Sequence, residues 1–173
     1  MKSPVAFITG ASSGFGRAIA ERFAAAGMQL VLLGRREDRL HELSKCLSVP
    51  CHTIACDVRD GDALRAAVAA IPGDFGRIDI LVNNAGLALG LEPAHRTEWS
   101  DWQQMIETNC TALALLTRLI VPGMVERRSG HIVLMGSVAG HYAYPGGNVY
   151  GASKAFVEQF ARGLRADLSG QGV

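Results

Sequence analysis

Several marks of specialised protein classes are missing from this sequence. Its 173 residues carry a net charge of only +1, and no basic stripe indicates binding to nucleic acid. The four cysteines form no C-x-x-C pair, and none lies at zinc-ligand spacing with a histidine. The five histidines do not cluster either. We therefore expect no metal site and no nucleic-acid partner.

Long hydrophobic runs are missing too. The apolar run Val5–Thr9 is too short for the core of a signal peptide. The run Leu113–Val121 is interrupted by Arg118 and followed by Pro122, so it is far shorter than a membrane-spanning segment. Unpaired cysteines are typical of reducing compartments. The sequence therefore predicts a soluble cytoplasmic protein that does not bind membranes.

What the sequence does contain is a regular alternation of short apolar runs with longer helical stretches. Its length favours one domain, residues 1–173, and 49% hydrophobic residues can form a substantial core. The predicted strands are Val5–Thr9, Gln29–Leu33, His52–Asp57, Ile78–Asn83 and His131–Met135. The predicted helices are about Arg17–Ala26, Glu37–Leu47, Asp60–Ala70, Asp101–Glu126 and Val149–Leu168. This order predicts an α/β fold with a doubly wound parallel sheet, helices on both faces.

A glycine-rich segment follows the first predicted strand and opens the first predicted helix. Glycines let backbone N–H groups approach a pyrophosphate, and the helix N-terminus adds the positive end of its dipole. Glycines also serve ordinary tight turns, but the position between a strand and a helix favours dinucleotide binding. The residues expected to contact the cofactor here are Gly10, Ser12, Ser13, Gly14, Phe15 and Gly16.

The residues after the second predicted strand indicate which dinucleotide is bound. An acidic residue there usually holds a ribose 2′-hydroxyl, whereas a 2′-phosphate requires cations. This sequence has Arg35 and Arg36 at that place, and guanidinium groups match phosphate in charge and in forked geometry. A solvated basic turn is the alternative. We expect NADP(H) rather than NAD(H).

The spacing T-G-x-x-x-G-x-G, which begins at Thr9, resembles the phosphate loop of the short-chain dehydrogenase/reductase family. Asn83-Asn84-Ala85-Gly86 resembles the family's N-N-A-G segment, and Asp57-Val58 resembles its adenine-contacting D-V pair. The resemblance covers essentially the whole chain. It implies a Rossmann fold with five strands in the order 3-2-1-4-5, and cofactor contacts from Asp57, Val58, Asn84, Ala85 and Gly86.

Tyr150 and Lys154 form a Y-x-x-x-K pair in the last predicted helix. Residues four apart share a helix face, so the lysine ammonium can stabilise a tyrosine phenolate, as general acid–base catalysis requires. Such a pair also occurs by chance on helix surfaces. Ser137 follows the fifth predicted strand, where its hydroxyl can reach a substrate carbonyl. Asn109 is a poor residue for a helix interior, and its alternative role is a tolerated kink.

All four residues match the family's Asn-Ser-Tyr-Lys set, and this resemblance implies their roles. Ser137 holds the carbonyl oxygen, and Tyr150 donates the proton. Lys154 binds the nicotinamide ribose, so Tyr150 and Lys154 also count as cofactor contacts. An Asn at the position of Asn109 holds a water that links the lysine to bulk solvent. The expected enzyme is an NADP-dependent oxidoreductase acting on CH–OH groups.

Two loops, 81–94 and 144–150, resemble the NADP-dependent 3-hydroxy acid dehydrogenase subgroup of the family. The resemblance implies short 3-hydroxy acids such as serine, allo-threonine or 3-hydroxypropionate as substrates. Two alternatives stay open. One is an NADPH-dependent carbonyl reductase for another ketone or an acyl thioester, and the other is a non-catalytic dinucleotide-binding or interaction protein.

The resemblance also bears on the end of the chain and on assembly. The family has a sixth and a seventh strand that would follow Val173, so we expect this sequence to be a piece of a longer protein. The related enzymes form homotetramers, partly through long central helices like the one predicted at Asp101–Glu126. We expect a homo-oligomer, with a dimer as a possible form of this chain.

Overall fold

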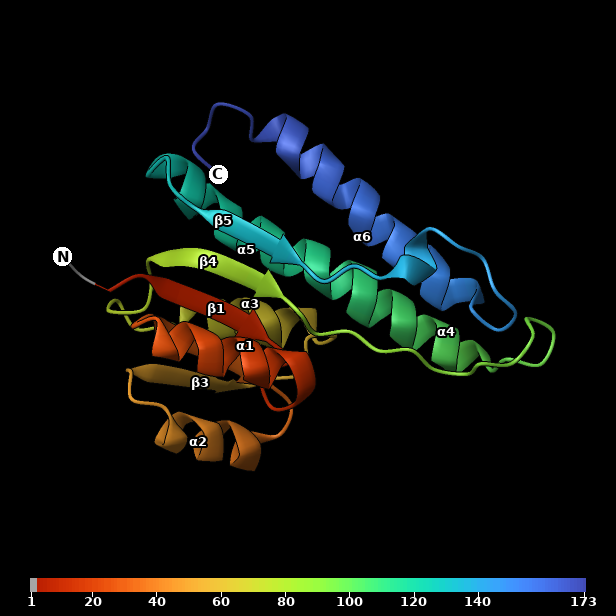
Figure 1. Ribbon diagram of the computed structural model, residues 1–173, viewed down its shortest axis with the longest axis horizontal. Helices are drawn as coiled ribbons and strands as arrows, with labels where there is room; N and C mark the ends of the chain where they lie inside the picture. The colour runs from red at the N-terminus through yellow and green to blue at the C-terminus, as the bar shows by residue number, and fades with distance from the viewer. Residues whose placement is uncertain (1–2) are drawn as a thin grey trace.

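The computed structural model describes residues 3–173, which form one parallel sheet of five strands covered by helices (Figure 1). The strand order is β3-β2-β1-β4-β5, so the predicted fold and strand order are confirmed. The strands are β1 (Val5–Thr9), β2 (Gln29–Gly34), β3 (Cys51–Ala55), β4 (Ile78–Asn83) and β5 (His131–Leu134). The predicted third strand, His52–Asp57, lies two residues too far along the chain at its end, because Cys56 and Asp57 already belong to the loop.

Two hydrophobic layers hold helices against the two faces of the sheet. Alternate residues of each strand point to opposite faces, so Phe7 of β1 packs in one layer while Ile8 packs in the other. The layer around Phe7 includes Leu64 of α3 (Gly61–Ala69). The layer around Ile8 contacts α1 (Gly14–Ala25) and α2 (Glu37–Cys46).

The long helix predicted over Asp101–Glu126 begins two residues earlier and changes its winding in the middle. It consists of α4 (Trp99–Ile106), a π-helical segment η1 (Glu107–Ala112) and α5 (Leu113–Glu126). Leu116, Ile120 and Met124 of α5 are buried in the layer around Phe7. The prediction of one uniform α-helix was therefore wrong in its centre.

The run Trp99–Glu126 is long and apolar enough, by length and composition alone, to span a membrane. The apolar run Leu113–Val121 is too short to indicate a membrane span by itself. The segment becomes long enough only when α4, η1 and α5 are counted together. Met124 and Leu116 are almost fully buried beneath the sheet. In this fold, therefore, one side of the run packs in the core of the domain.

The last helix, α6 (Asn148–Asp167), lies beside α4 and η1 (Figure 1). A short 3-10 turn, η2 (Val138–Gly140), precedes it and packs closely on its first turns. A Cβ added to Gly140 would lie 2.9 Å from the amide nitrogen of Ala155, and one added to Gly151 would lie 2.8 Å from the carbonyl oxygen of Ala139. Only glycine allows this approach, which fixes η2 against α6.

Candidate active site

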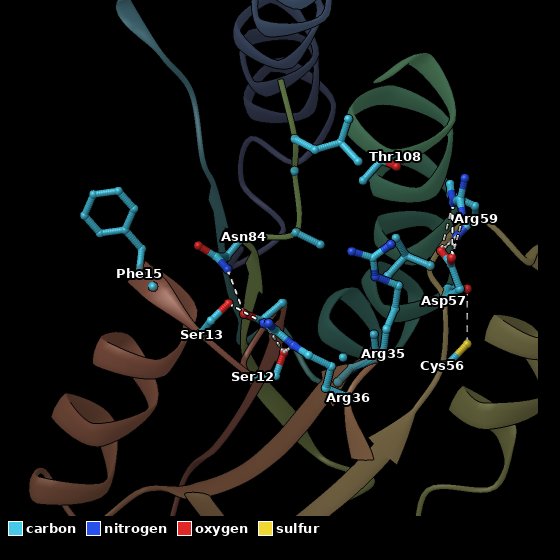
Figure 2. Close-up of a pocket in the computed structure, with 18 residues that line it drawn as sticks. Ser12, Ser13, Phe15, Arg35, Arg36, Cys56, Asp57, Arg59, Asn84 and Thr108 are labelled. Carbon is cyan, nitrogen blue, oxygen red and sulfur yellow. Dashed lines mark hydrogen bonds and ion pairs between the residues drawn. The ribbon is translucent and has the colours of Figure 1, made fainter. Parts of the chain in front are cut away.

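A cleft of ≈ 330 Å³ opens at the carboxyl ends of the strands (Figure 2), where open α/β sheets bind their ligands. Segments that follow β1, β2, β3 and β4 form most of its lining. The lining includes every residue predicted to contact the cofactor except Gly16, Tyr150 and Lys154: Gly10, Ser12, Ser13, Gly14, Phe15, Arg35, Arg36, Asp57, Val58, Asn84, Ala85 and Gly86. Phe15 stands at the rim, 77% exposed.

The glycine-rich loop is tightly wound over the end of β1. Gly10 has φ +67, a conformation that L side chains rarely adopt. Gly16 contributes in another way, because a Cβ there would lie 2.3 Å from the carbonyl oxygen of Gly10. Gly16 therefore lets the first turn of α1 close onto the loop, which explains why it supports the cleft without lining it.

Thr9 and Asn84 join the loop to the end of β4. The hydroxyl of Thr9 accepts hydrogen bonds from the backbone N–H groups of Asn84 (3.0 Å) and Ala85 (2.9 Å). The amide Nδ2 of Asn84 donates in return to the carbonyl oxygen of Thr9 at 2.8 Å. These reciprocal bonds tie the start of the glycine-rich loop to the segment that follows β4.

The arginine pair after β2 lies against the glycine-rich loop. The guanidinium of Arg36 donates from Nη2 to the hydroxyl oxygens of Ser12 (3.1 Å) and Ser13 (2.6 Å). Arg35 is exposed and lines the same cleft. The Arg36 guanidinium and two serine hydroxyls therefore lie together in the cleft that Arg35 also lines, and such a donor set suits a phosphate group.

The carboxylate of Asp57 is held by Arg59, a residue that the sequence prediction missed. Nη2 of Arg59 donates to Oδ2 of Asp57 at 2.7 Å, and Nε donates to Oδ1 at 3.1 Å (Figure 2). Hydrogen bonding to Arg59, aided by the charge of Arg35, lowers the pKa of Asp57. Arg59 also lines the cleft. Its position directly after the D-V pair was the only sequence signal available.

Lys154 is buried on the inner face of α6, 8% exposed. Its ammonium Nζ donates to the carbonyl oxygen of Met135 at 2.7 Å and lies 5.9 Å from the centre of the Tyr150 ring. Burial lowers the pKa of Lys154. The cleft adjoins this pair at Gly86, where an added Cβ would lie 3.4 Å from Nζ. The predicted pairing of these two side chains on one helix is thus present.

Ser137 begins the η2 turn, two residues beyond the carbonyl that holds Lys154. Its hydroxyl oxygen accepts a hydrogen bond from the backbone N–H of Ala139 at 3.2 Å. A serine hydroxyl can accept and donate at once, so this bond leaves its O–H free to donate. The close packing of Gly140 and Gly151 holds η2 beside the turn of α6 that carries Tyr150.

Asn109 lies in the π-helical segment and is 1% exposed. Its side chain clamps the loop after β4 by accepting from the backbone N–H of Leu87 and donating to the carbonyl oxygen of Leu87, both at 2.9 Å. It also donates to the hydroxyl of Ser153 at 3.0 Å. π-helical turns often mark functional sites, and this one brings a buried amide between the cleft and α6.

Comparison with known proteins decides the family. The family model described as short chain dehydrogenase matches residues 4–173. The chain belongs to the short-chain dehydrogenase family. It is therefore an oxidoreductase, and the cleft and the Tyr150 region are its candidate active site.

Individual relatives are similar over almost the whole chain. A sulfoacetaldehyde reductase of Chromohalobacter salexigens is 56% identical over 170 residues, which is 96% of this chain and 67% of that protein. The NADP-dependent 3-hydroxy acid dehydrogenase YdfG of Escherichia coli is 49% identical over 169 residues, 98% of this chain and 68% of that protein.

Solved structures agree with the fold. Serine dehydrogenase from Escherichia coli superimposes with a TM-score of 0.93 at 49% identity, over 96% of this chain and 77% of that chain. A closed form of serine dehydrogenase complexed with NADP+ gives a TM-score of 0.94 at 49% identity, over 96% of this chain and 67% of that chain. The similarity thus includes a relative whose structure contains the dinucleotide.

Proposed function

We propose that this protein transfers a hydride between NADP(H) and the hydroxyl or carbonyl carbon of a short 3-hydroxy acid. The observation that carries the proposal is the buried ammonium of Lys154, which is bonded to Met135 and lies 5.9 Å from the centre of the Tyr150 ring. An ammonium held there stabilises the phenolate that remains after Tyr150 gives up its proton. The pair therefore supports acid–base catalysis at a carbonyl oxygen.

NADP(H) is the proposed cofactor because of the cations and hydroxyls around the predicted 2′-phosphate position. Arg35 and Arg36 would neutralise the phosphate, while Ser12 and Ser13 would donate to it. The Escherichia coli relative at 49% identity is an NADP-dependent 3-hydroxy acid dehydrogenase, which supports this choice. Asp57 and Val58 would hold the adenine, and Asn84, Ala85 and Gly86 would line the path to the nicotinamide.

Bound NADPH supplies the hydride that reduces the substrate carbonyl carbon. The free O–H of Ser137 donates to the carbonyl oxygen and fixes its position. Tyr150 donates a proton to the same oxygen, and the Lys154 ammonium stabilises the phenolate; the same ammonium would hold the nicotinamide ribose of the bound cofactor. Asn109 positions the water that links Lys154 to bulk solvent, and through this water a proton returns to Tyr150. The Asn109 side chain also keeps Leu87 in place. Alcohol oxidation uses the same groups in reverse.

The substrate class rests on the relatives and on chemistry that they share. A 3-hydroxy acid carries its carboxylate on the carbon next to the carbinol carbon. The alcohol formed from sulfoacetaldehyde carries a sulfonate at the same place. Sulfoacetaldehyde reduction is the second candidate function, favoured by the 56% identity to the Chromohalobacter salexigens enzyme. Both candidates require a short aldehyde or alcohol with one neighbouring anion.

A substrate panel tests the proposal and separates the candidates. Purified protein would be assayed in the oxidation direction with serine and 3-hydroxypropionate, using NADP+ or NAD+. The reduction direction would use malonic semialdehyde, sulfoacetaldehyde and an uncharged ketone with NADPH or NADH, and both directions are read by the absorbance of the reduced nicotinamide. We expect turnover of a 3-hydroxy acid or its aldehyde with NADP(H). Preference for sulfoacetaldehyde would select the second candidate, preference for the ketone would contradict both, and no cofactor binding would overturn the proposal.

We also propose that the protein works as a homo-oligomer in the cytoplasm. Ile106 of α4 and Phe156 of α6 are large apolar side chains that are 41% and 40% exposed. Exposed apolar groups on neighbouring long helices support contact with a second copy. Light scattering coupled to size exclusion tests this, and a monomeric mass at working concentration would contradict it.

A further inference from the structure

Asn148 joins three segments of the chain at the start of α6, two residues before Tyr150. Its Oδ1 accepts from the indole Nε1 of Trp102 in α4 at 2.9 Å and from the backbone N–H of Val149 at 2.7 Å. Its Nδ2 donates to the carbonyl oxygen of Glu92, in the loop after β4, at 3.3 Å. Both ends of this amide are therefore engaged.

The turn before Asn148 is built to bring the same segments together. Gly146 has φ +80, and a Cβ there would lie 2.3 Å from the carbonyl oxygen of Leu91. Gly90, with φ +56, approaches α4 so closely that an added Cβ would lie 2.8 Å from Oδ2 of Asp101. The loop after β4, the start of α4 and the start of α6 thus meet around Asn148.

On the side that meets α4 and the loop after β4, little else fixes the first turn of α6. Its N-cap residue, Gly147, has no side chain to cap the helix, whereas Asn148 satisfies the free N–H of Val149. On the other side of Tyr150, Gly151 rests against Ala139 of η2. The backbone is consequently held on both sides of Tyr150. Gly151 holds it against η2, the turn that Ser137 begins, and Asn148 holds it against the loop after β4.

We propose that Asn148, with Trp102 as its hydrogen-bond donor, is a positioning residue for Tyr150. The inference rests on the proposed function, because it assumes that Tyr150 is the proton donor. Asn148 acts through the backbone of α6 and the loop after β4, both of which border the reaction centre. Asn148 and Trp102 do not line the cofactor cleft, so their effect falls on turnover and leaves dinucleotide binding unchanged.

The test compares Asn148→Ala, Asn148→Asp and Trp102→Phe with the parent. Asn148→Ala removes every side-chain bond, and we expect kcat to fall by about tenfold to a hundredfold, the range for a displacement near 1 Å at a reaction centre. The dissociation constant for NADP+ stays within about twofold of the parent, because the substitution affects catalysis and not cofactor binding. A variant that bound the cofactor less well would show a raised dissociation constant. Asn148→Asp keeps both accepted bonds but loses the bond to the Glu92 carbonyl oxygen, so it restores only part of kcat.

Two further readouts separate positioning from general destabilisation. Trp102→Phe lowers kcat, and in the double variant with Asn148→Ala it adds almost nothing, because the two residues share one bond. In a Trp99→Phe background, Trp102 emission shifts to the red when Asn148 becomes Ala. Trp99→Phe is the matched control, since that side chain is 65% exposed, and it leaves kcat unchanged.

The proposal is overturned if Asn148→Ala keeps kcat within about twofold of the parent, or if the two single effects multiply fully in the double variant. It is also overturned if kcat and NADP+ affinity fall together, because that result marks a loss of fold. Failure of the proposed function looks different: the parent protein itself would then bind no NADP+ or turn over no substrate on the panel.

Discussion

Arg36 is the residue whose contacts bear most directly on the choice of cofactor. It spans from the end of β2 to the glycine-rich loop through Ser12 and Ser13. Sequence alone could identify it, because a cation at that position has a clear reason in an α/β fold. Sequence could not identify Arg59, Trp102 or Asn148, because the role of each depends on a hydrogen-bond partner that only the fold brings near. Trp102 and Asn148, for example, are separated by 46 positions.

Replacement of Arg36 tests the assignment of the 2′-phosphate. Loss of one charge-assisted hydrogen bond costs about 2 kcal/mol, so in Arg36→Ala the KM for NADPH rises roughly 30-fold. The KM for NADH stays within about twofold, since NADH has no 2′-phosphate on its adenosine ribose. Arg77→Ala is the control, because this exposed side chain lies just before β4 and forms an ion pair with Asp79. Equal losses with both cofactors would contradict the assignment.

Lys154 offers a test in which stability and activity move in opposite directions. Its ammonium is buried, and burial lowers its pKa, so the folded state holds this proton less tightly than the unfolded state. Replacement by Met removes that cost, and Lys154→Met should be more stable by about 1 kcal/mol at neutral pH while losing turnover. Urea unfolding measures the first effect, and the NADPH assay measures the second.

The pH dependence of that difference follows from linkage. Between the lowered folded pKa of Lys154 and its ordinary unfolded pKa, the unfolded state binds more protons, so the free energy of unfolding of the parent rises with pH. The stability advantage of Lys154→Met therefore shrinks as pH rises through the folded pKa. A difference that is constant with pH, or that widens, would show that the ammonium is not penalised by burial.

At the scale of elements, the sequence predicted where strands and helices lie but missed how one helix is wound. β1 and β4 have the predicted bounds, because continuous apolar runs end at a glycine or at paired asparagines. The π-helical segment Glu107–Ala112 depends on Asn109 reaching Leu87 and Ser153. Those partners are distant along the chain, so a local pattern could show only that Asn109 is unusual in a helix.

The glycine-rich loop gives a prediction at the same scale. A Cβ at Gly16 would meet the carbonyl oxygen of Gly10 at 2.3 Å and Nδ2 of Asn84 at 2.6 Å. Gly16→Ala should therefore destabilise the fold by about 1–3 kcal/mol and weaken NADP+ binding, measured by thermal unfolding and by titration calorimetry. Gly163→Ala, in the interior of α6 with nothing near its Cβ position, is the control and should stabilise by about 0.5–1 kcal/mol. The same response at both positions would refute this account of the loop.

At the scale of the molecule, the sheet order brings together residues that the sequence spreads from Gly10 to Lys154. β1 lies centrally, between β2 and β4, so the loops after these strands meet in one cleft. The doubly wound pattern was sufficient to predict this meeting, since parallel strands end at the same edge. The distances within the site, such as 5.9 Å from the Lys154 ammonium to the Tyr150 ring centre, required the packing of η2 and α6.

The central claim is that this assembled site moves a proton through Tyr150 during NADPH-dependent carbonyl reduction. The most direct measurement is single-turnover oxidation of NADPH by Tyr150→Phe and by the parent, with the best substrate of the panel. NADPH binding is read separately from the increase in Tm that the cofactor causes. We predict that the variant keeps the Tm increase and loses turnover by about a thousandfold or more, within the range for general acid–base groups. Turnover within about tenfold of the parent, with binding intact, would contradict the account.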